Sequence, residues 1–459
     1  MLGQLRPMTT ARAGSSRTVQ ELAALIVVAL AVRLAWLQRG VIVTADGSLY
    51  LKAARNLVLH HVFSHGQSAL DIVPTVNHPP LYPALIALLW WTESAPRLAT
   101  GLLQVAFSAA TVGLVYLIAR ERFNRTVALL ASAGMTLAPM SSFYTTLILT
   151  ETVFTFLVTL GVFLWGRERA ALCGVAFGLA ALTRTTMLPF VVLLLLLPLL
   201  PAWRRAWRTY LLIALTALTV SSVWIVRDAF VSGRFVPVAT GGGLNLLFGT
   251  IETSIFGTLY WTGSAWTTQQ REIPVFQADE ALPEVERDRA RARRALGRIL
   301  ADPLRWLIIR AKQYPKLFID TGAYVLDPAG DAHNSTPATP RSLVLSIKAV
   351  FILGNLAVMC LAAFAIFSER ARFASLTHIM LFPLYLSVIH LALWIEPRYS
   401  LPMMPLVAIL AALGALRLAG KPVYEEQGEN ASSTATGERK KSTGRDRDCQ
   451  DERQKRDER

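Results

Sequence analysis

The sequence is poor in charged residues. Asp, Glu, Lys and Arg make up 17% of its 459 residues, whereas a soluble domain typically contains about 25%. Hydrophobic residues make up 53% and form long uncharged runs, of which 190–200 is one example. Such runs are typical of helices that cross a membrane. This composition excludes a soluble nucleotide-binding enzyme, a secreted disulfide scaffold and a largely disordered protein.

Cysteine is also scarce. Cys173 and Cys360 fall inside apolar segments, and Cys449 lies in a charged tail. Their spacing fits neither a metal-binding knuckle nor a disulfide framework. The three cysteines therefore point to no chemistry.

The formal net charge of +15 does not indicate a nucleic-acid partner. The arginines that create it stand in short clusters between apolar segments. This distribution is what the positive-inside rule describes for the cytoplasmic loops of a membrane protein. We therefore expect membrane lipid, and no nucleic acid, as a partner.

The apolar segments predict an all-α polytopic membrane protein with about ten transmembrane helices, within a range of nine to twelve, because a helix needs about 20 residues to cross the bilayer. Arg184 divides the stretch 170–201 into two short halves, which makes the number of spans there hard to fix. The predicted spans are 20–39, 97–119, 126–143, 149–166, 170–183, 185–201, 208–227, 342–367, 373–394 and 399–418.

The first apolar run has a second interpretation, as the core of a signal peptide. It follows about 18 basic and polar residues, as such a core does. No small-residue cleavage site clearly follows, and Arg33 lies inside the run. We therefore expect an uncleaved first span after a cytoplasmic N-terminus, residues 1–18.

Four basic clusters orient the remaining spans. With ten spans, all four clusters fall on the cytoplasmic side, together with a charged tail, 419–459, whose composition predicts disorder. The short apolar segment 79–91 would invert this arrangement if it crossed the membrane, so we interpret it as a re-entrant or interfacial helix. The clusters are Arg120/Arg122/Arg125, Arg167/Arg169, Arg204/Arg205/Arg208 and Arg370/Arg372.

Two long segments, 40–97 and 228–341, then lie outside the cytoplasm. In the second, residues 284–299 and the run after Pro303 mix apolar and basic residues, which predicts amphipathic helices on the membrane surface. No internal repeat is evident, and this disfavours a transporter built from repeated halves.

Asp46 and Tyr50 follow the first span and share one face of a predicted helix, four residues apart. A structural interpretation of Asp46 is a helix N-cap, which Asp46 or the neighbouring Thr44 can supply. His78 stands before two prolines and has the alternative of an ordinary hydrogen-bonded loop residue. Glu151 begins a later span, where the helix dipole by itself favours an acid.

Several ionisable groups are predicted at the same outer membrane boundary as Glu151. Ionisable groups near membrane depth are rare and usually functional. Arginines facing an acid there indicate a site for a phosphorylated ligand dissolved in the membrane. Gly241–Gly243 can form a phosphate-cradling loop or a plain turn. The boundary residues are Arg184, Arg227, Glu396, Arg398 and Tyr399.

Six motifs occur in an order that resembles the GT-C class of membrane glycosyltransferases. Within that class the chain is most similar to the protein O-mannosyltransferase-like and aminoarabinose-transferase-like groups, over residues 20–418. The motifs are DGSLYLKAARNL, HPPLYPAL, LTETVFTFL, GLAALTRTTMLPF, WIVRDAFVSGRFVPVATGGGLNLLFGT and EPRYSLPMMPL.

The resemblance implies transfer of a sugar, with inversion, from a polyprenyl-phosphate donor to a hydroxyl of a lipid, glycan or protein acceptor. It implies a general base at Asp46 and a second acid at Glu151. Arg184 matches a Lys or Arg that follows the glycine-rich span, and His78 replaces a Lys of the aminoarabinose-transferase group. The expected location is the plasma (inner) membrane, with the site on the periplasmic face.

Residue types in the same motifs suggest which side chains would bind the lipid phosphate and substrates. That set is Tyr50, His78, Arg184, Arg227, Arg398 and Tyr399. No ligand spacing requires a metal, but Asp46, His78 and Glu151 are able to approach one ion, so a divalent metal is left open.

Two other functions fit the composition. One is a transporter or flippase of lipid-linked sugars, which needs broken helices and charges at the bilayer midplane. The other is an oligosaccharide polymerase or ligase of a different membrane class. Only the transferase would consume a polyprenyl-phosphate sugar and release polyprenyl phosphate.

The charge clusters yield a topology prediction. A reporter fused after Arg125 or after Arg208 is expected to be cytoplasmic, and one fused near Asp279 extracytoplasmic, because basic loops stay inside. Paired alkaline phosphatase and green fluorescent protein fusions measure this directly. A cytoplasmic Asp279 fusion would remove the outer-face site.

Overall fold

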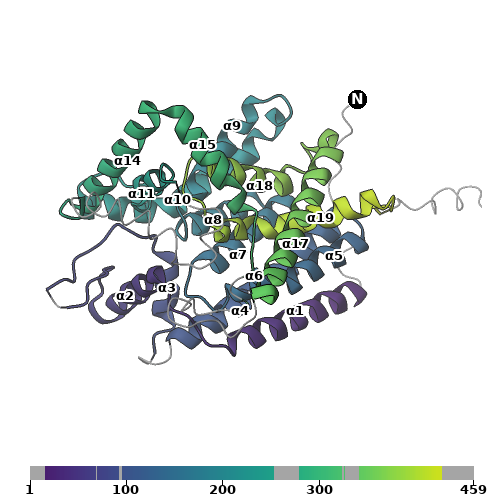
Figure 1. Ribbon diagram of the computed structural model, residues 1–459, viewed down its shortest axis with the longest axis horizontal. Coiled ribbons are helices and arrows are strands. Elements are labelled where there is room, and N and C mark those ends of the chain that lie inside the picture. Colours follow the sequence, from purple (N-terminus) through teal and green to yellow (C-terminus); the bar gives the residue numbers. More distant parts are fainter. Residues whose placement is uncertain are drawn as a thin grey trace, which may run out of the picture.

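The structure is a computed structural model that describes residues 16–68, 70–91, 96–252, 279–322, 325 and 341–425. Over these residues it is almost entirely helical (Figure 1), and its β-structure is one isolated bridge between Ile42 and Leu147. The expected all-α class is confirmed. The far N-terminus and most of the predicted charged tail lie outside the described residues.

An apolar helix coincides with each of the ten predicted spans. Five of these regions are long and apolar enough to cross a membrane: Ser16–Leu37, Pro96–Arg122, Arg204–Ser232, Leu345–Ser368 and Pro397–Leu418. The chain is therefore a polytopic membrane protein, and the crossing of the five shorter helices stays a prediction. The ten helices are α1 (Ser16–Leu37), α4 (Pro96–Arg122), α5 (Arg125–Leu137), α7 (Glu151–Gly166), α8 (Ala170–Ala181), α9 (Met187–Leu196), α10 (Trp207–Ser232), α17 (Arg341–Ser368), α18 (Thr377–Ile389) and α19 (Met404–Leu418).

Close packing of small residues holds the bundle together, as is usual where helices are surrounded by lipid. A Cβ on Gly174 of α8 would lie 2.5 Å from the carbonyl oxygen of Ile213 on α10. A Cβ on Gly414 of α19 would lie 2.1 Å from that of Leu361 on α17. These glycines bring the helix backbones together. A larger residue at either position would force them apart.

Arg33 lies near the C-terminal end of α1 and is fully buried. Its guanidinium donates to Ser108 Oγ on α4 at 2.8 Å, and to the carbonyl oxygens of Met135 and Thr136 at the end of α5 at 2.9 and 3.0 Å. These bonds compensate for burying a charge that would otherwise be very costly. Arg33 thus anchors the first span to its neighbours.

The outer segments add shorter elements to one end of the bundle, at the left of Figure 1, where α2, α3, α11 and α14 lie together. The predicted short helix after His78 is confirmed as α3, and the two amphipathic helices as α14 and α15. Their position on a membrane surface stays a prediction. The elements are α2 (Ala45–His60), α3 (Leu81–Leu88), α11 (Gly242–Phe248), α14 (Glu284–Ala301), α15 (Pro303–Gln313) and the 3-10 helix η4 (Tyr314–Leu317). The short helix α6 (Pro139–Phe143) belongs to the bundle and follows α5.

Helix α14 connects the two outer segments through its acids. Glu284 accepts hydrogen bonds from Thr75 Oγ1 at 2.5 Å and from the Val76 N–H at 2.8 Å. Asp288 Oδ1 accepts from the N–H groups of Gly241 and Gly243 at 3.0 and 2.9 Å. A carboxylate of the chain itself thus occupies the glycine-rich loop, and the phosphate-cradle hypothesis for this loop is not supported.

The first residues of the expected tail pack onto the other end of the bundle. Tyr424 donates its hydroxyl to Glu369, a buried acid that also accepts two hydrogen bonds from Arg417. Arg372 pairs with the same acid at 3.6 Å. These contacts anchor the chain after α19 against the short 3-10 helix η5 (Arg370–Arg372), part of one basic cluster.

Candidate active site

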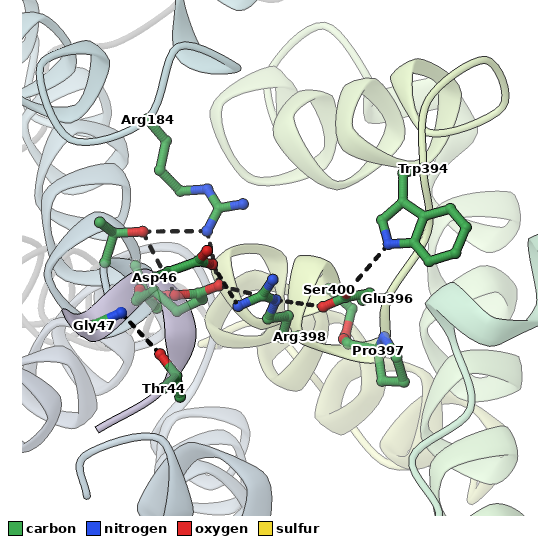
Figure 2. Close-up of polar contacts among 12 residues, drawn as sticks. Thr44, Asp46, Gly47, Arg184, Trp394, Glu396, Pro397, Arg398 and Ser400 are labelled. Carbon is green, nitrogen blue, oxygen red and sulfur yellow. Dashed lines mark hydrogen bonds and ion pairs between the residues drawn. The ribbon is translucent and has the colours of Figure 1, made fainter. Parts of the chain in front are cut away.

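Asp46 does not cap helix α2. Thr44 is the N-cap residue, and its Oγ1 accepts a hydrogen bond from the Gly47 N–H at 2.9 Å (Figure 2). The Asp46 carboxylate, which is 44% exposed, instead lies 3.3 Å from Nη1 of Arg398. Of the two structural interpretations of this turn, the structure selects Thr44, and the Asp46 side chain is available for other chemistry.

A close backbone contact brings the start of α2 against the start of α7. The Ile42 N–H donates to the Thr146 carbonyl at 2.8 Å, and the Ile148 N–H donates to the Ile42 carbonyl at 3.1 Å. A Cβ on Gly47 would come within 2.6 Å of the Ile148 oxygen. Only glycine permits this approach, which places Asp46 near Glu151 although 105 residues separate them in the sequence.

Glu151 is the first residue of α7 and is 1% exposed. Its Oε1 accepts a hydrogen bond from Arg184 Nη1 at 2.8 Å and lies 3.6 Å from Arg398 Nε. A buried carboxylate is tolerated when charged donors compensate for its lost hydration. Two guanidinium groups do so here, from the loop after α8 and from the C-terminal segment.

Arg398 joins these groups. It lies in the 3-10 helix η6 (Pro397–Met403) and contacts Asp46, Glu151 and Glu396, whose Oε2 is 2.5 Å from its Nε (Figure 2). The other oxygen of Glu396 accepts from Trp394 Nε1 at 3.0 Å. The motif EPRYSLP thus supplies both the central cation and an acid that orients it.

Arg310 on α15 anchors the segment that leads into η6. It is buried, and its guanidinium donates to the carbonyl oxygens of Leu391, Leu393 and Gly249 at 3.0, 2.9 and 2.9 Å. No sequence signal distinguishes this arginine from the others of α15. It shows how the second outer segment supports the site.

The charge balance differs from the one expected. The sequence suggested one acid facing three arginines. The structure gathers Asp46, Glu151 and Glu396 around Arg184 and Arg398, and these three carboxylates outnumber the two guanidinium groups. A phosphate therefore has to compete with a carboxylate for a guanidinium.

Arg227 makes its contacts elsewhere. Its Nη1 donates to the Thr75 carbonyl at 2.6 Å and to Asp228 Oδ1 at 2.7 Å. Its guanidinium carbon lies 4.6 Å from the centre of the Trp224 ring. Among the described contacts none joins Arg227 to Glu151 or Arg398.

Two tyrosines line the acid–arginine cluster. The ring of Tyr399 lies 5.2 Å from the Arg184 guanidinium and 5.4 Å from that of Arg398. Tyr50, one turn after Asp46, is buried, and burial together with the charges of Asp46 and Glu151 raises the pKa of its hydroxyl. Tyr50 is therefore a neutral hydrogen-bonding group and not a base.

His78 packs edge-on against Tyr50, with ring centres 5.3 Å apart, and against His65 at 4.9 Å. Burial lowers the pKa of His78, while the charge of Asp46 acts in the opposite direction. Its imidazole is consequently neutral near pH 7. The structure thus places His78 beside Asp46, without the fixed positive charge of the lysine found in the aminoarabinose-transferase group.

Lys316 is a charged residue near the site that the sequence did not reveal. It lies buried in η4. Burial, and then the charge of Arg310, lower its pKa to about 8, and the charge of Glu396 opposes this.

Over the described residues, no group of three or more His, Cys, Asp or Glu side chains is arranged to hold a metal ion.

Two comparisons with known proteins give matches, one to part of the sequence and one to the fold. A family model described as dolichyl-phosphate-mannose-protein mannosyltransferase matches residues 77–226, which include His78, Glu151 and Arg184. No curated protein sequence matches the chain significantly. Among solved structures, the oligosaccharyltransferase of Archaeoglobus fulgidus with a tethered acceptor peptide superimposes with a TM-score of 0.51 at 13% identity, over 88% of this chain and 49% of that one.

The chain has the GT-C fold. It spans about half the length of the oligosaccharyltransferase it resembles. The ArnT enzyme of Cupriavidus metallidurans bound to undecaprenyl phosphate, a second GT-C structure, aligns at 15% identity with a TM-score of 0.42, over 87% of this chain and 78% of that one. The oligosaccharyltransferase match confirms the expected GT-C class at the level of the fold.

The cap geometry predicts different stabilities for two neighbouring substitutions. Thr44→Ala should destabilise the protein by about 1 kcal/mol, because the N-cap bond is lost. Asp46→Asn should leave the melting temperature close to that of wild type, since Asp46 does not cap the helix. Thermal unfolding of both variants in detergent measures this. Equal destabilisation by the two would show that Asp46 has a structural role.

Proposed function

We propose that this protein is an integral-membrane glycosyltransferase that moves a sugar from a polyprenyl-phosphate donor to an extracytoplasmic acceptor hydroxyl, with inversion. The observation that carries the proposal is the position of Arg398, which contacts the partly exposed Asp46 on one side and the buried Glu151 on the other. Arg398 thereby links Asp46, the candidate base, with the candidate phosphate site that Arg398 and Arg184 form around Glu151.

The family match supports the class of donor. The matching model describes enzymes that use dolichyl-phosphate mannose, a sugar linked to a polyprenyl phosphate. The motifs outside the matched region, DGSLYLKAARNL and EPRYSLPMMPL, supply Asp46 and Arg398.

In the proposed reaction, the acceptor oxygen attacks the anomeric carbon of the donor from the side opposite the phosphate. The bond between that carbon and the phosphate oxygen breaks, and the electron pair leaves with the polyprenyl phosphate. Asp46 takes the proton of the acceptor hydroxyl, as a general base. Arg184 and Arg398 stabilise the charge that grows on the phosphate.

Donor binding and base activation are coupled through Arg398. The Asp46 contact, at 3.3 Å, is longer than the contacts of Arg398 with Glu396 and of Arg184 with Glu151. Asp46 is also the most exposed of the three acids. A donor phosphate that approaches Arg398 displaces this carboxylate most easily. Asp46 is then released from its cation and is free to accept the proton of the acceptor hydroxyl when the donor is in place.

Glu151 has a different role in this scheme. It is buried, and both arginines converge on its Oε1. Such a carboxylate positions the guanidinium groups and is shielded from an acceptor. We therefore assign it to organising the phosphate site, and the catalytic base to Asp46. The outer-segment origin of Asp46 supports an extracytoplasmic site in the plasma membrane.

The decisive substitution is Asp46→Asn. The amide cannot accept a proton at working pH, and general-base catalysis is typically worth about 10²- to 10⁴-fold. Turnover should fall by at least about 100-fold, while donor binding is kept or strengthened, because the carboxylate that competes for Arg398 has become a neutral amide. The measurement is transfer from radiolabelled polyprenyl-phosphate mannose in membranes with matched protein levels. If turnover stays within about threefold of wild type, where a lost general base predicts at least 10², Asp46 is not the base.

The arginines separate into two classes. Arg184→Ala and Arg398→Ala should raise the donor KM and lower kcat, and lysine at either position should restore activity only in part, because the bidentate fork is lost. Arg227→Ala should affect phosphate recognition less, since Arg227 contacts the Thr75 carbonyl and Asp228. The assay is the same, with donor concentration varied. Loss of phosphate recognition in Arg227→Ala alone would reverse this assignment.

A further inference from the structure

A continuous row of rings leads away from the proposed base. It starts at Tyr50, passes through His78 and His65, and continues through Phe63 to Trp224. Consecutive ring centres are 5.3, 4.9, 6.1 and 5.0 Å apart. The loop between α2 and α3 supplies the middle three rings, and α10 supplies the last. We refer to these five residues as the aromatic row.

Three members of the row carry ring nitrogens without a hydrogen-bond partner in the described structure. They are Nε2 of His65, Nδ1 of His78 and Nε1 of Trp224. Buried polar groups are nearly always paired, so each exception calls for an explanation. Three exceptions in one row, beginning beside Asp46, point to a ligand that supplies hydrogen-bonding groups.

The same three residues are half-buried, whereas Phe63 is almost fully buried and packs edge-on against the Trp224 ring. Ring surface therefore remains accessible at His65, His78 and Trp224. Half a turn of an imidazole about its last side-chain torsion exchanges a covered nitrogen with a ring carbon. The row thus offers apolar ring faces to a ligand, and its two imidazoles can turn a nitrogen toward that ligand.

The imidazoles are neutral under working conditions. Burial lowers the pKa of His65 to about 3, and the nearby charges of His78 and Lys52 act in the same direction. A neutral imidazole has one donor and one acceptor nitrogen. This suits an uncharged partner rich in hydroxyl groups better than a phosphate or a carboxylate.

We propose that the aromatic row is the binding subsite for a sugar ring of the acceptor, so that the acceptor of this transferase is a carbohydrate. A sugar presents C–H groups on its faces, which pack on aromatic rings, and hydroxyl groups at its edge, which pair with ring nitrogens. The row begins at Asp46, which takes the proton of the acceptor. In the proposed reaction the donor phosphate binds at Arg398, which contacts the same carboxylate.

Arg227 acquires a role in this subsite. Its guanidinium lies 4.6 Å from the centre of the Trp224 ring and 5.6 Å from that of Phe63. Its hydrogen bond to the Thr75 carbonyl connects α10 to the loop that carries His78. Arg227 is therefore a positioning residue that holds the two halves of the row together. The inference rests on the proposed glycosyltransferase function.

The test uses the full-length protein in detergent and an equimolar panel of methyl glycosides of mannose, glucose, galactose and arabinose. Saturation-transfer NMR detects their binding. Trp224→Leu should weaken binding by about tenfold, equivalent to about 1.4 kcal/mol, because an aromatic face is lost. Trp224→Phe, which keeps a ring without the N–H, should lose less.

The matched control is Trp207→Leu, at the other end of the same helix. Trp207 is also stacked near an arginine, Arg208, at 5.4 Å. It lies outside the row, so the variant should bind the glycosides as wild type does. Equal loss of glycoside binding in both variants would indicate a general effect on the helix and would overturn the proposal. Glycoside binding by Trp224→Leu that equals wild type would overturn it as well.

A second arm separates the acceptor sugar from the donor sugar. Binding of polyprenyl-phosphate mannose and of polyprenyl phosphate is measured for wild type and Trp224→Leu. Unchanged affinity for both lipids supports an acceptor subsite. Weakened binding of the mannosylated lipid alone would place the donor sugar in the row and would overturn the proposed acceptor subsite. A wild-type protein that binds neither lipid would instead contradict the glycosyltransferase function itself.

Discussion

A cation shared by three carboxylates is the constraint on which the rest of the site depends. Arg398 is 13% exposed, and Asp46, Glu151 and Glu396 surround it. An unpaired charge in such a place would cost several kcal/mol. Helices α2 and α7 and the segment before α19 must therefore come together for any of these groups to be buried.

The neighbouring structure meets this requirement with backbone contacts and further buried charges. Gly47 allows the first turn of α2 to touch Ile148, and Thr44 takes over the helix cap, so that Asp46 can face Arg398. Arg310 anchors the chain before η6. Each contact positions a group that the proposed chemistry uses, although none of them belongs to the reaction.

The two kinds of surface around Asp46 divide the proposed substrates by their chemistry. On one side lie guanidinium groups, which suit a phosphate. Beside Asp46 also lie the neutral rings of the aromatic row, which suit a sugar. Among the described residues, the one ion pair of Asp46 is its 3.3 Å contact with Arg398. In the proposed mechanism, this arrangement lets a single exposed acid respond to the donor and act on the acceptor.

Hydropathy and charge patterning were sufficient to predict the helices, because each apolar run must satisfy its backbone within one helix when it is surrounded by lipid. The same local patterns predicted α3, α14 and α15, and motif order indicated the GT-C class. Asp46, Glu151, Arg184 and Arg398 were recognisable as ionisable groups at span boundaries. Their convergence was not determined by composition, since it depends on contacts between segments distant in the sequence.

Tertiary structure alone decided which charges pair. It separated Arg227 from Arg398, assigned the cap to Thr44, filled the glycine-rich loop with Asp288 and buried Lys316 near Glu396. It also aligned His65, Phe63 and Trp224, three residues that no local pattern connects. Helix formation is a local matter of hydrogen bonds and hydrophobicity, whereas pairing of charges and rings depends on distances of a few ångströms between elements, which only the packed chain determines.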